Sequence, residues 1–205
     1  MNLMMKRAKY KTLSIAAILL SMILLQSCNN EYTAKPKAYP RVIYPEKKFE
    51  SFSPENCPFE FEKPVYAFVE KDTDYFGKTI ADKCWINIQF PEFNGTLNLT
   101  YKEINKENTL VKLIEDAHKL SFKHSKKANY IDEVLIENKY GVGGLLYNVG
   151  GDAASNFQFF LTDTNRHFIR GALYFNNEPN TDSMAPIISF VQKDLDHFLE
   201  TFRWK

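Results

Sequence analysis

Cys28 is the residue whose setting points most clearly to a chemical reaction. It follows Leu25-Gln26-Ser27, so an aliphatic residue stands at position −3 and a small residue at position −1 relative to the cysteine. This pattern resembles a lipobox, in which the thiol is diacylated before the preceding segment is removed. Cysteine suits the reaction because its thiolate is a good nucleophile for taking up the glyceryl group.

The segment before Cys28 has the composition of an export signal. Four basic residues and no acidic ones precede an apolar run at positions 13–25. This run is shorter than the about 20 apolar residues that cross a bilayer, and it fits the apolar centre of a secretory signal. We therefore predict a lipoprotein signal peptide at residues 1–27 and a membrane anchor at Cys28. The alternative is an ordinary secretory signal that happens to end at a cysteine.

Two further cysteines, Cys57 and Cys84, remain once Cys28 is acylated. An even pair in an oxidising compartment favours a disulfide. Closing a loop of this length would contribute about 3–4 kcal/mol on the chain-entropy model. The alternative is two buried free thiols. No nearby histidine or carboxylate has the spacing of a metal site.

The histidines and the only serine beside a glycine-rich stretch form no catalytic pattern. None of the histidines belongs to a ligand cluster, so we expect surface or boundary roles for His118, His124, His167 and His197. Ser155 follows Gly150-Gly151-Asp152 without the motif of a nucleophile elbow. Glycines 141, 143, 144, 150 and 151 precede no helix with a Lys-Ser/Thr pair, which excludes a phosphate-binding loop and favours a bulge and a tight turn. We expect a protein that is not an enzyme and needs no cofactor or metal. A hydrolase assembled from separate segments remains the least favoured alternative.

Two stretches are candidates for partner binding. The loop at 150–156 and the polar segment at 176–183 are expected to be exposed, which is where binding residues often lie. The residues that we single out there are Gly150, Gly151, Asp152, Ser155, Asn180 and Asp182. The basic stretch of Lys119, Lys123, Lys126, Lys127 and His124 either complements a helix dipole or docks onto an acidic partner, and we favour the first.

Composition and charge limit the classes of protein to consider. The chain has 205 residues with 26 basic and 25 acidic side chains, and residues 1–27 contain four of the basic ones and no acid. The remaining chain therefore has a net charge of −3, which argues against a nucleic-acid surface. The full chain contains 17 Phe and 11 Tyr, enough to fill a substantial core. We expect a proline-rich tether at residues 28–48, part of which lies along the domain, and one globular domain at residues 49–205.

The pattern of apolar residues predicts an α+β fold. Period-two runs at 59–62, 65–69, 84–90 and 96–104 indicate strands, with a hairpin turn at Asn94-Gly95. A helical stripe at 109–126 is followed by strands at 130–137, 142–149, 157–163 and 167–175 and by a helix at 185–202, with Pro186 in its first turn. Short connections imply a mainly antiparallel sheet with a long helix on each face. This order resembles an α/β/α sandwich of the PsbP/Mog1 type.

Over nearly all of its mature length, the chain also resembles the gliding-motility lipoprotein GldD family of Bacteroidetes. The resemblance lies in the order and spacing of short stretches at 35–41, 44–45, 56–59, 84–88, 99–101, 123–124, 157–163, 167–175, 179–180, 182–183 and 203–204. It implies a non-enzymatic accessory role in gliding motility and type IX protein secretion, with other lipoproteins or envelope proteins as partners. The lipidated Cys28 and the pair Cys57/Cys84 also resemble the family.

The residues after Cys28 bear on where in the envelope the protein lies. Asn29-Asn30-Glu31 lacks the run of acids associated with export to the cell surface in this phylum. The resemblance therefore implies the periplasmic side of the outer membrane. A carrier of lipid or another small ligand is the alternative function, because the many aromatic side chains could line a pocket between a helix and the sheet.

Overall fold

We analysed a computed structural model of the chain. It describes residues 41–72, 74–75, 78–79, 84–123, 127–176 and 181–205. The chain divides into two units, Met1–Lys37 and Ala38–Lys205. Every element described below belongs to the second unit. Cys28 and the predicted signal peptide lie outside the described residues.

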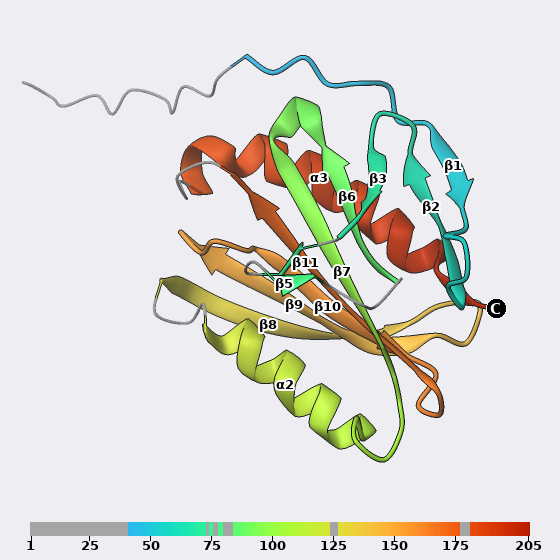
Figure 1. Ribbon diagram of the computed structural model, residues 1–205. Helices are drawn as coiled ribbons and strands as arrows, with labels where there is room; N and C mark the ends of the chain where they lie inside the picture. Colours follow the sequence, from blue (N-terminus) through green and yellow to red (C-terminus); the bar gives the residue numbers. More distant parts are fainter. Residues whose placement is uncertain (1–40, 73, 76–77, 80–83, 124–126, 177–180) are drawn as a thin grey trace, which may run out of the picture. The chain divides into compact units, whose positions relative to one another are not determined.

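A seven-stranded antiparallel sheet is the centre of this unit (Figure 1). Its strands, in spatial order, are β3 (Phe68–Lys71), β6 (Trp85–Phe90), β7 (Gly95–Glu103), β11 (His167–Phe175), β10 (Phe157–Thr162), β9 (Gly143–Gly151) and β8 (Ala128–Glu137). Side chains alternate between the two faces of each strand, so this sheet needs a cover on both sides. The 3₁₀ turn η1 (Pro91–Phe93) joins β6 to β7, and Asn94 takes a left-handed conformation with φ 51°.

The helix α3 (Thr181–Thr201) and a second sheet cover one face. The second sheet pairs β2 (Phe59–Pro64) with β1 (Phe49–Phe52) and with β12 (Arg203–Trp204). Between these layers lies the main core, which includes Phe59, Phe61, Leu97, Leu99, Phe159, Ile169, Leu195, Phe198 and Phe202.

The shorter helix α2 (Leu110–Phe122) covers part of the other face. The hydroxyl of Thr109 caps it by accepting a hydrogen bond from the backbone N–H of Lys112. Leu113 and Ala117 pack against Tyr147, Phe160 and Phe168 of β9, β10 and β11. On β6 and β7 the corresponding face carries polar cross-strand pairs instead, such as Asn98 with Asn87 and Thr96 with Gln89.

The prediction of mainly antiparallel sheets with two helices is confirmed. The description of one sheet flanked by two long helices is too simple, because α3 shares its face with the second sheet and α2 has only 13 residues. The prediction that Pro186 lies in the first turn of the last helix is also wrong. Polar residues that we assigned to a loop form the first turn of α3, which begins at Thr181. Pro186 therefore lies inside the helix. A separate two-stranded sheet joins β4 (Asp74–Tyr75) to β5 (Lys78–Thr79).

The end of the predicted tether lies against the folded unit. Val42 packs on the main core, and the ring of Tyr44 lies 4.6 Å from that of Phe190 on α3. The ammonium group of Lys47 pairs with the carboxylate of Asp194 and donates a hydrogen bond of 3.0 Å to the carbonyl oxygen of Phe190. Residues 42–47 are therefore held along α3 rather than free in solvent.

Candidate functional site: a groove between α3 and the edge strand β8

The strand β8 is an exposed edge. Within the part of the chain that the structure describes, it pairs with β9 on one side and with no strand on the other. It is ten residues long, and Tyr130, Val134 and Leu135 expose 57%, 46% and 85% of their surface. An edge strand of this length offers unpaired backbone groups to another chain.

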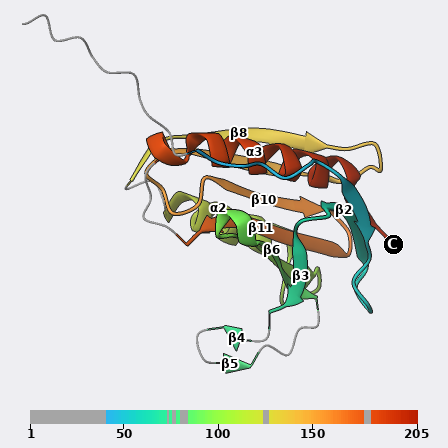
Figure 2. The ribbon, with the colours of Figure 1, turned by 90° about the horizontal axis from the view of Figure 1, so that it is seen from above.

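Beside this edge, the surface is hollowed in two places along α3. The upper hollow, of about 340 Å³, lies between Tyr130 and Asp132 of β8 and Ile188 and Gln192 of α3. The lower hollow, of about 600 Å³, lies between Leu135 and Glu137 of β8 and Asp196 and Glu200 of α3. We call these two hollows together the α3–β8 groove. In Figure 2 the ribbon of α3 overlaps that of β8, and residues of both elements line each hollow.

A glycine shapes the upper hollow. The ring of Tyr130 lies over Gly150 of β9 so closely that a Cβ atom at Gly150 would stand 2.1 Å from the Tyr130 ring. Any other residue at position 150 would push the tyrosine ring away. The absence of a side chain at Gly150 therefore lets Tyr130 form the wall of the hollow.

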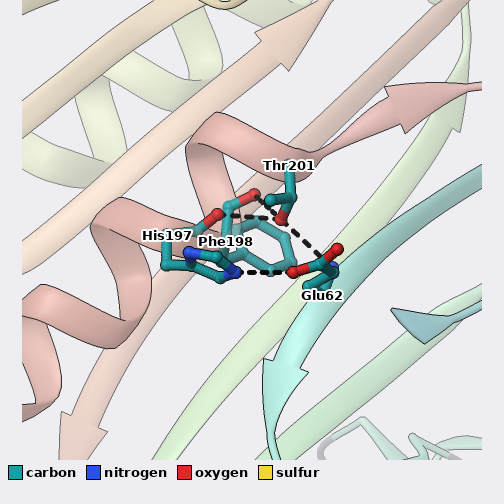
Figure 3. Close-up of polar contacts among 4 residues, drawn as sticks. All are labelled: Glu62, His197, Phe198 and Thr201. Carbon is teal, nitrogen blue, oxygen red and sulfur yellow. Dashed lines mark hydrogen bonds and ion pairs between the residues drawn. The ribbon is translucent and has the colours of Figure 1, made fainter. Parts of the chain in front are cut away.

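Figure 3 shows the polar contacts that fix the lower hollow. The Nε2 atom of His197 lies 2.7 Å from a carboxylate oxygen of Glu62 on β2. The hydroxyl of Thr201 accepts a hydrogen bond of 3.1 Å from the backbone N–H of Glu62 and donates one of 2.8 Å to the carbonyl oxygen of His197. The ring of Phe49 stacks on His197 at 3.8 Å. Because these contacts tie β1 and β2 to α3, they give His197 a structural role.

Asn138 closes the lower end of the groove. Its side-chain amide donates hydrogen bonds of 2.9 and 2.7 Å to the carbonyl oxygens of Leu199 and Phe202 at the end of α3. Its side-chain oxygen accepts hydrogen bonds from the backbone of Tyr140 and Val142. The turn after β8 is therefore attached to the end of α3, which makes this part of the groove preorganised.

The charge of the groove is negative. Its walls carry four acidic residues and one lysine, which are Asp132, Glu137, Asp196, Glu200 and Lys139. The lining also includes His197, which already has Glu62 as its partner. Partial loss of water contact, and then the neighbouring charge of Glu200, raise the pKa of the Asp196 carboxyl above its ordinary value. The second of these causes is repulsion between the carboxylates of Asp196 and Glu200, which a neighbouring cation would reduce.

The predicted partner-binding residues do not form one exposed surface in the structure. Gly150 and Gly151 belong to β9, and Gly150 lines the upper hollow. Asp152 is exposed. The expectation of exposure is wrong for Ser155, whose side chain is buried and donates to the carbonyl oxygen of Phe157, because the chain turns inward before β10. Asp182 lies in α3 rather than in a loop, and Asn180 is outside the described residues.

The cysteine prediction is confirmed, and the other histidines have identifiable partners. Cys57 and Cys84 form a disulfide with a Cα–Cα distance of 5.6 Å. His118 lies 3.4 Å from Glu133 on the surface, and the Nδ1 atom of His167 lies 2.8 Å from the hydroxyl of Tyr101. His124 lies outside the described residues. Among the residues that are described, no three His, Cys, Asp or Glu side chains are grouped as a metal site.

Sequence analysis missed a buried polar cluster on α3. The side chain of Asp194 is fully shielded from solvent and accepts hydrogen bonds from Lys47 and from the hydroxyl of Tyr66. Burial, and then this carboxylate, raise the pKa of Tyr66 far above its ordinary value. The signal that could have found the cluster is the position of Asp194 on the apolar stripe of the helix, next to Val191, Leu195 and Phe198.

Residues 29–204 match the family model described as gliding motility lipoprotein GldD. The chain therefore belongs to the GldD family of gliding motility lipoproteins, which makes it a lipoprotein of the cell envelope associated with this form of movement. No helix in the described part of the chain has both the length and the apolar character needed to span a bilayer.

The other comparisons add little to this. No curated protein sequence matches the chain. The solution structure of cyanobacterial PsbP (CyanoP) from Synechocystis sp. PCC 6803 is similar with a TM-score of 0.46 and 12% identity, over 88% of this chain and 99% of that chain. A similarity of this size carries no conclusion about fold or function.

Proposed function

We propose that this GldD-family lipoprotein is a non-enzymatic assembly component of gliding motility and type IX secretion, and that it binds another envelope protein through the α3–β8 groove. The observation that carries the proposal is the exposed ten-residue edge of β8 beside two hollows in a chain of this family. A protein that supports assembly needs a binding surface and a fixed location. Lipid at Cys28 would supply the location and raise the local concentration of the protein at the membrane.

The outer membrane, with the domain in the periplasm, is the location that we propose. The sequence after Cys28 lacks the acidic run that would favour the cell surface, and a disulfide between Cys57 and Cys84 suits an oxidising compartment. On this proposal residues 1–27 are the signal peptide, residues 28–48 begin as a tether and residues 49–205 form the binding domain, with helices and sheet layered in the PsbP/Mog1 manner.

The absence of enzymatic activity is part of the same proposal. His118, His167 and His197 each have a partner that fixes the ring: a carboxylate for His118 and His197, and a tyrosine hydroxyl for His167. Ser155 is buried and bonded to the backbone. These contacts favour structural roles over general acid–base or nucleophilic chemistry, which needs a nucleophile and a base within reach of a substrate.

The alternative of a lipid or small-ligand carrier loses its support. Such a carrier needs a cavity between a helix and the sheet. The space between α3 and the sheet, as far as the structure describes it, is filled by a layer of buried aromatic rings that includes Phe59, Phe61, Phe159, Phe198 and Phe202. The upper hollow reaches Phe157 and Leu173 at the border of this layer, and both hollows are open to solvent.

Site-specific photo-crosslinking in living cells tests the proposal. A photoreactive amino acid replaces Val134, which lies on the groove face of β8 and exposes 46% of its surface, or, as a matched control, Val111 on α2, which exposes 65%. We expect a protein adduct from position 134 and none from position 111, and loss of gliding and secretion when the gene is deleted. Normal gliding and secretion in the deletion strain, or identical adducts at both positions, would contradict the proposal.

A further inference from the structure

We propose that the occupant of the α3–β8 groove is an extended, basic segment of a partner protein that adds a strand to β8. This inference rests on the proposed function and names the chemistry of the partner. It combines two observations, the open edge of β8 and the acidic lining of the groove.

The edge of β8 favours a strand as the bound form. An added strand would form backbone hydrogen bonds with β8, which supply affinity without regard to sequence. Exposed apolar groups of Tyr130, Val134 and Leu135 lie along this edge, and burying them would add to that affinity.

The geometry of pairing directs alternate side chains of the added strand into the groove. Tyr130 and Asp132 of β8 line the upper hollow, and Ile136 on the same face lines the lower one. Side chains of a neighbouring strand point to the same two faces with a period of two residues. Every second residue of the bound segment would therefore stand over the groove.

The acids select basic side chains at those positions. Lysine or arginine in the upper hollow would approach Asp132, and in the lower hollow it would approach Asp196 and Glu200. Lys139 is the only lysine or arginine of the lining, so a cationic side chain would meet an excess of negative charge.

The same charges argue against a second copy of this chain as the occupant. The strand β8 contains Asp132, Glu133 and Glu137 and no basic residue. If two copies of β8 paired edge to edge, the carboxylates of one copy would lie near those of the other. Like charges on neighbouring strands destabilise a sheet.

Binding of a designed probe tests the inference. The mature lipidated protein is placed in nanodiscs of uncharged lipid and titrated with a fluorescent ten-residue peptide that alternates valine and lysine. Two comparison peptides carry glutamate in place of lysine, or proline at two central valine positions. We expect saturable binding of the lysine peptide alone, with slower hydrogen exchange of the β8 amides. The proline peptide should bind at least about tenfold more weakly, because proline removes the backbone donors of a strand.

Charge variants locate the binding. Asp196→Asn with Glu200→Gln should weaken binding of the lysine peptide by about 3- to 30-fold, as expected for two partly exposed ion pairs. The matched control, Glu115→Gln with Asp116→Asn, removes the same charge from the exposed face of α2 and should change affinity less than about twofold, as expected away from the site. Circular dichroism and thermal unfolding verify that both variants are folded.

Each contrary result overturns the inference. Equal binding of the proline peptide would mean adsorption to charge without strand addition, and equal binding of the glutamate peptide would remove the role of charge. Dimers that form through β8 without peptide would identify a second copy as the occupant. Absence of any peptide binding while position 134 still crosslinks to a protein in cells would reject the basic strand and leave the proposed function standing.

Discussion

Replacing Lys47 by methionine is expected to destabilise the protein measurably, although Lys47 lies in the segment that the sequence indicates as a tether. Its ammonium group neutralises Asp194, a carboxylate with no exposed side-chain surface. Methionine keeps most of the aliphatic stem of lysine and removes only the charge. The buried carboxylate would then retain Tyr66 as a hydrogen-bond donor but would lose its counterion.

The expected magnitude follows from the burial of the pair. Removing one partner of a fully buried ion pair costs about 3–5 kcal/mol, and losing a hydrogen bond to a charged group costs about 1.5–3 kcal/mol. The side chain of Lys47 is 30% exposed, so the lower range applies and we expect a loss of about 2–3 kcal/mol. For a domain of this size the melting temperature should fall by about 4–12 °C.

Urea unfolding of the oxidised mature chain with Cys28→Ala, followed by tryptophan fluorescence, measures this loss. Lys48→Met is the matched control, because Lys48 pairs at 2.8 Å with Glu46 and both side chains are largely exposed. Its effect should be below about 0.5 kcal/mol. In an Asp194→Asn background, Lys47→Met should have a much smaller effect than in the wild type. Equal losses for Lys47→Met and Lys48→Met, or an undiminished effect of Lys47→Met in the Asp194→Asn background, would refute the reasoning.

Three further predictions concern stability. Reducing the disulfide, or Cys57→Ala with Cys84→Ala, should lower the free energy of unfolding by about 3–4 kcal/mol for a separation of 27 residues, and an unchanged urea midpoint would contradict this. Burial favours a higher pKa for Asp163, but backbone N–H bonds from residues 165–167 and the charge of His167 outweigh it and lower that pKa. Its stabilisation is present above its unfolded pKa of about 3.9 and is lost as the pH falls towards the lower folded value, so Asp163→Asn should flatten the dependence of the urea midpoint below about pH 4. Gly171→Ala would place a Cβ atom 2.2 Å from the buried Phe159 ring and should destabilise by about 1–3 kcal/mol, unlike Gly143→Ala, where the nearest atom is 4.0 Å away.

The elements that could be predicted from the sequence are those with a local pattern. Apolar residues at helical spacing led to both helices, and the intervening polar residues of α3, such as Lys193 and Glu200, are exposed. Alternating residues led to β6, β7, β10 and β11. The short strands were missed because their pairing is not local: β12 joins Arg203 to Glu60, which are 143 residues apart.

The candidate site could be predicted only in small part. Gly150 was singled out for its type and does line the upper hollow. The groove itself depends on which strand ends the sheet, and the sequence of β8 does not reveal that β9 is its only partner among the described strands. Strand order is decided by packing between distant segments, so an edge becomes visible only in the folded chain.

The two proposed attachments of this protein meet on one helix. Near its middle, α3 holds Lys47 through Asp194 and the carbonyl oxygen of Phe190, and residue 47 leads back along the chain towards Cys28. Two residues further along, Asp196 faces the groove. A pull between the lipid anchor and a strand added to β8 would therefore load two places, the contacts of residues 42–47 with α3 and the pairing of β8 with β9. Weakening the Lys47–Asp194 pair should therefore loosen residues 42–47 from α3 while leaving the groove intact.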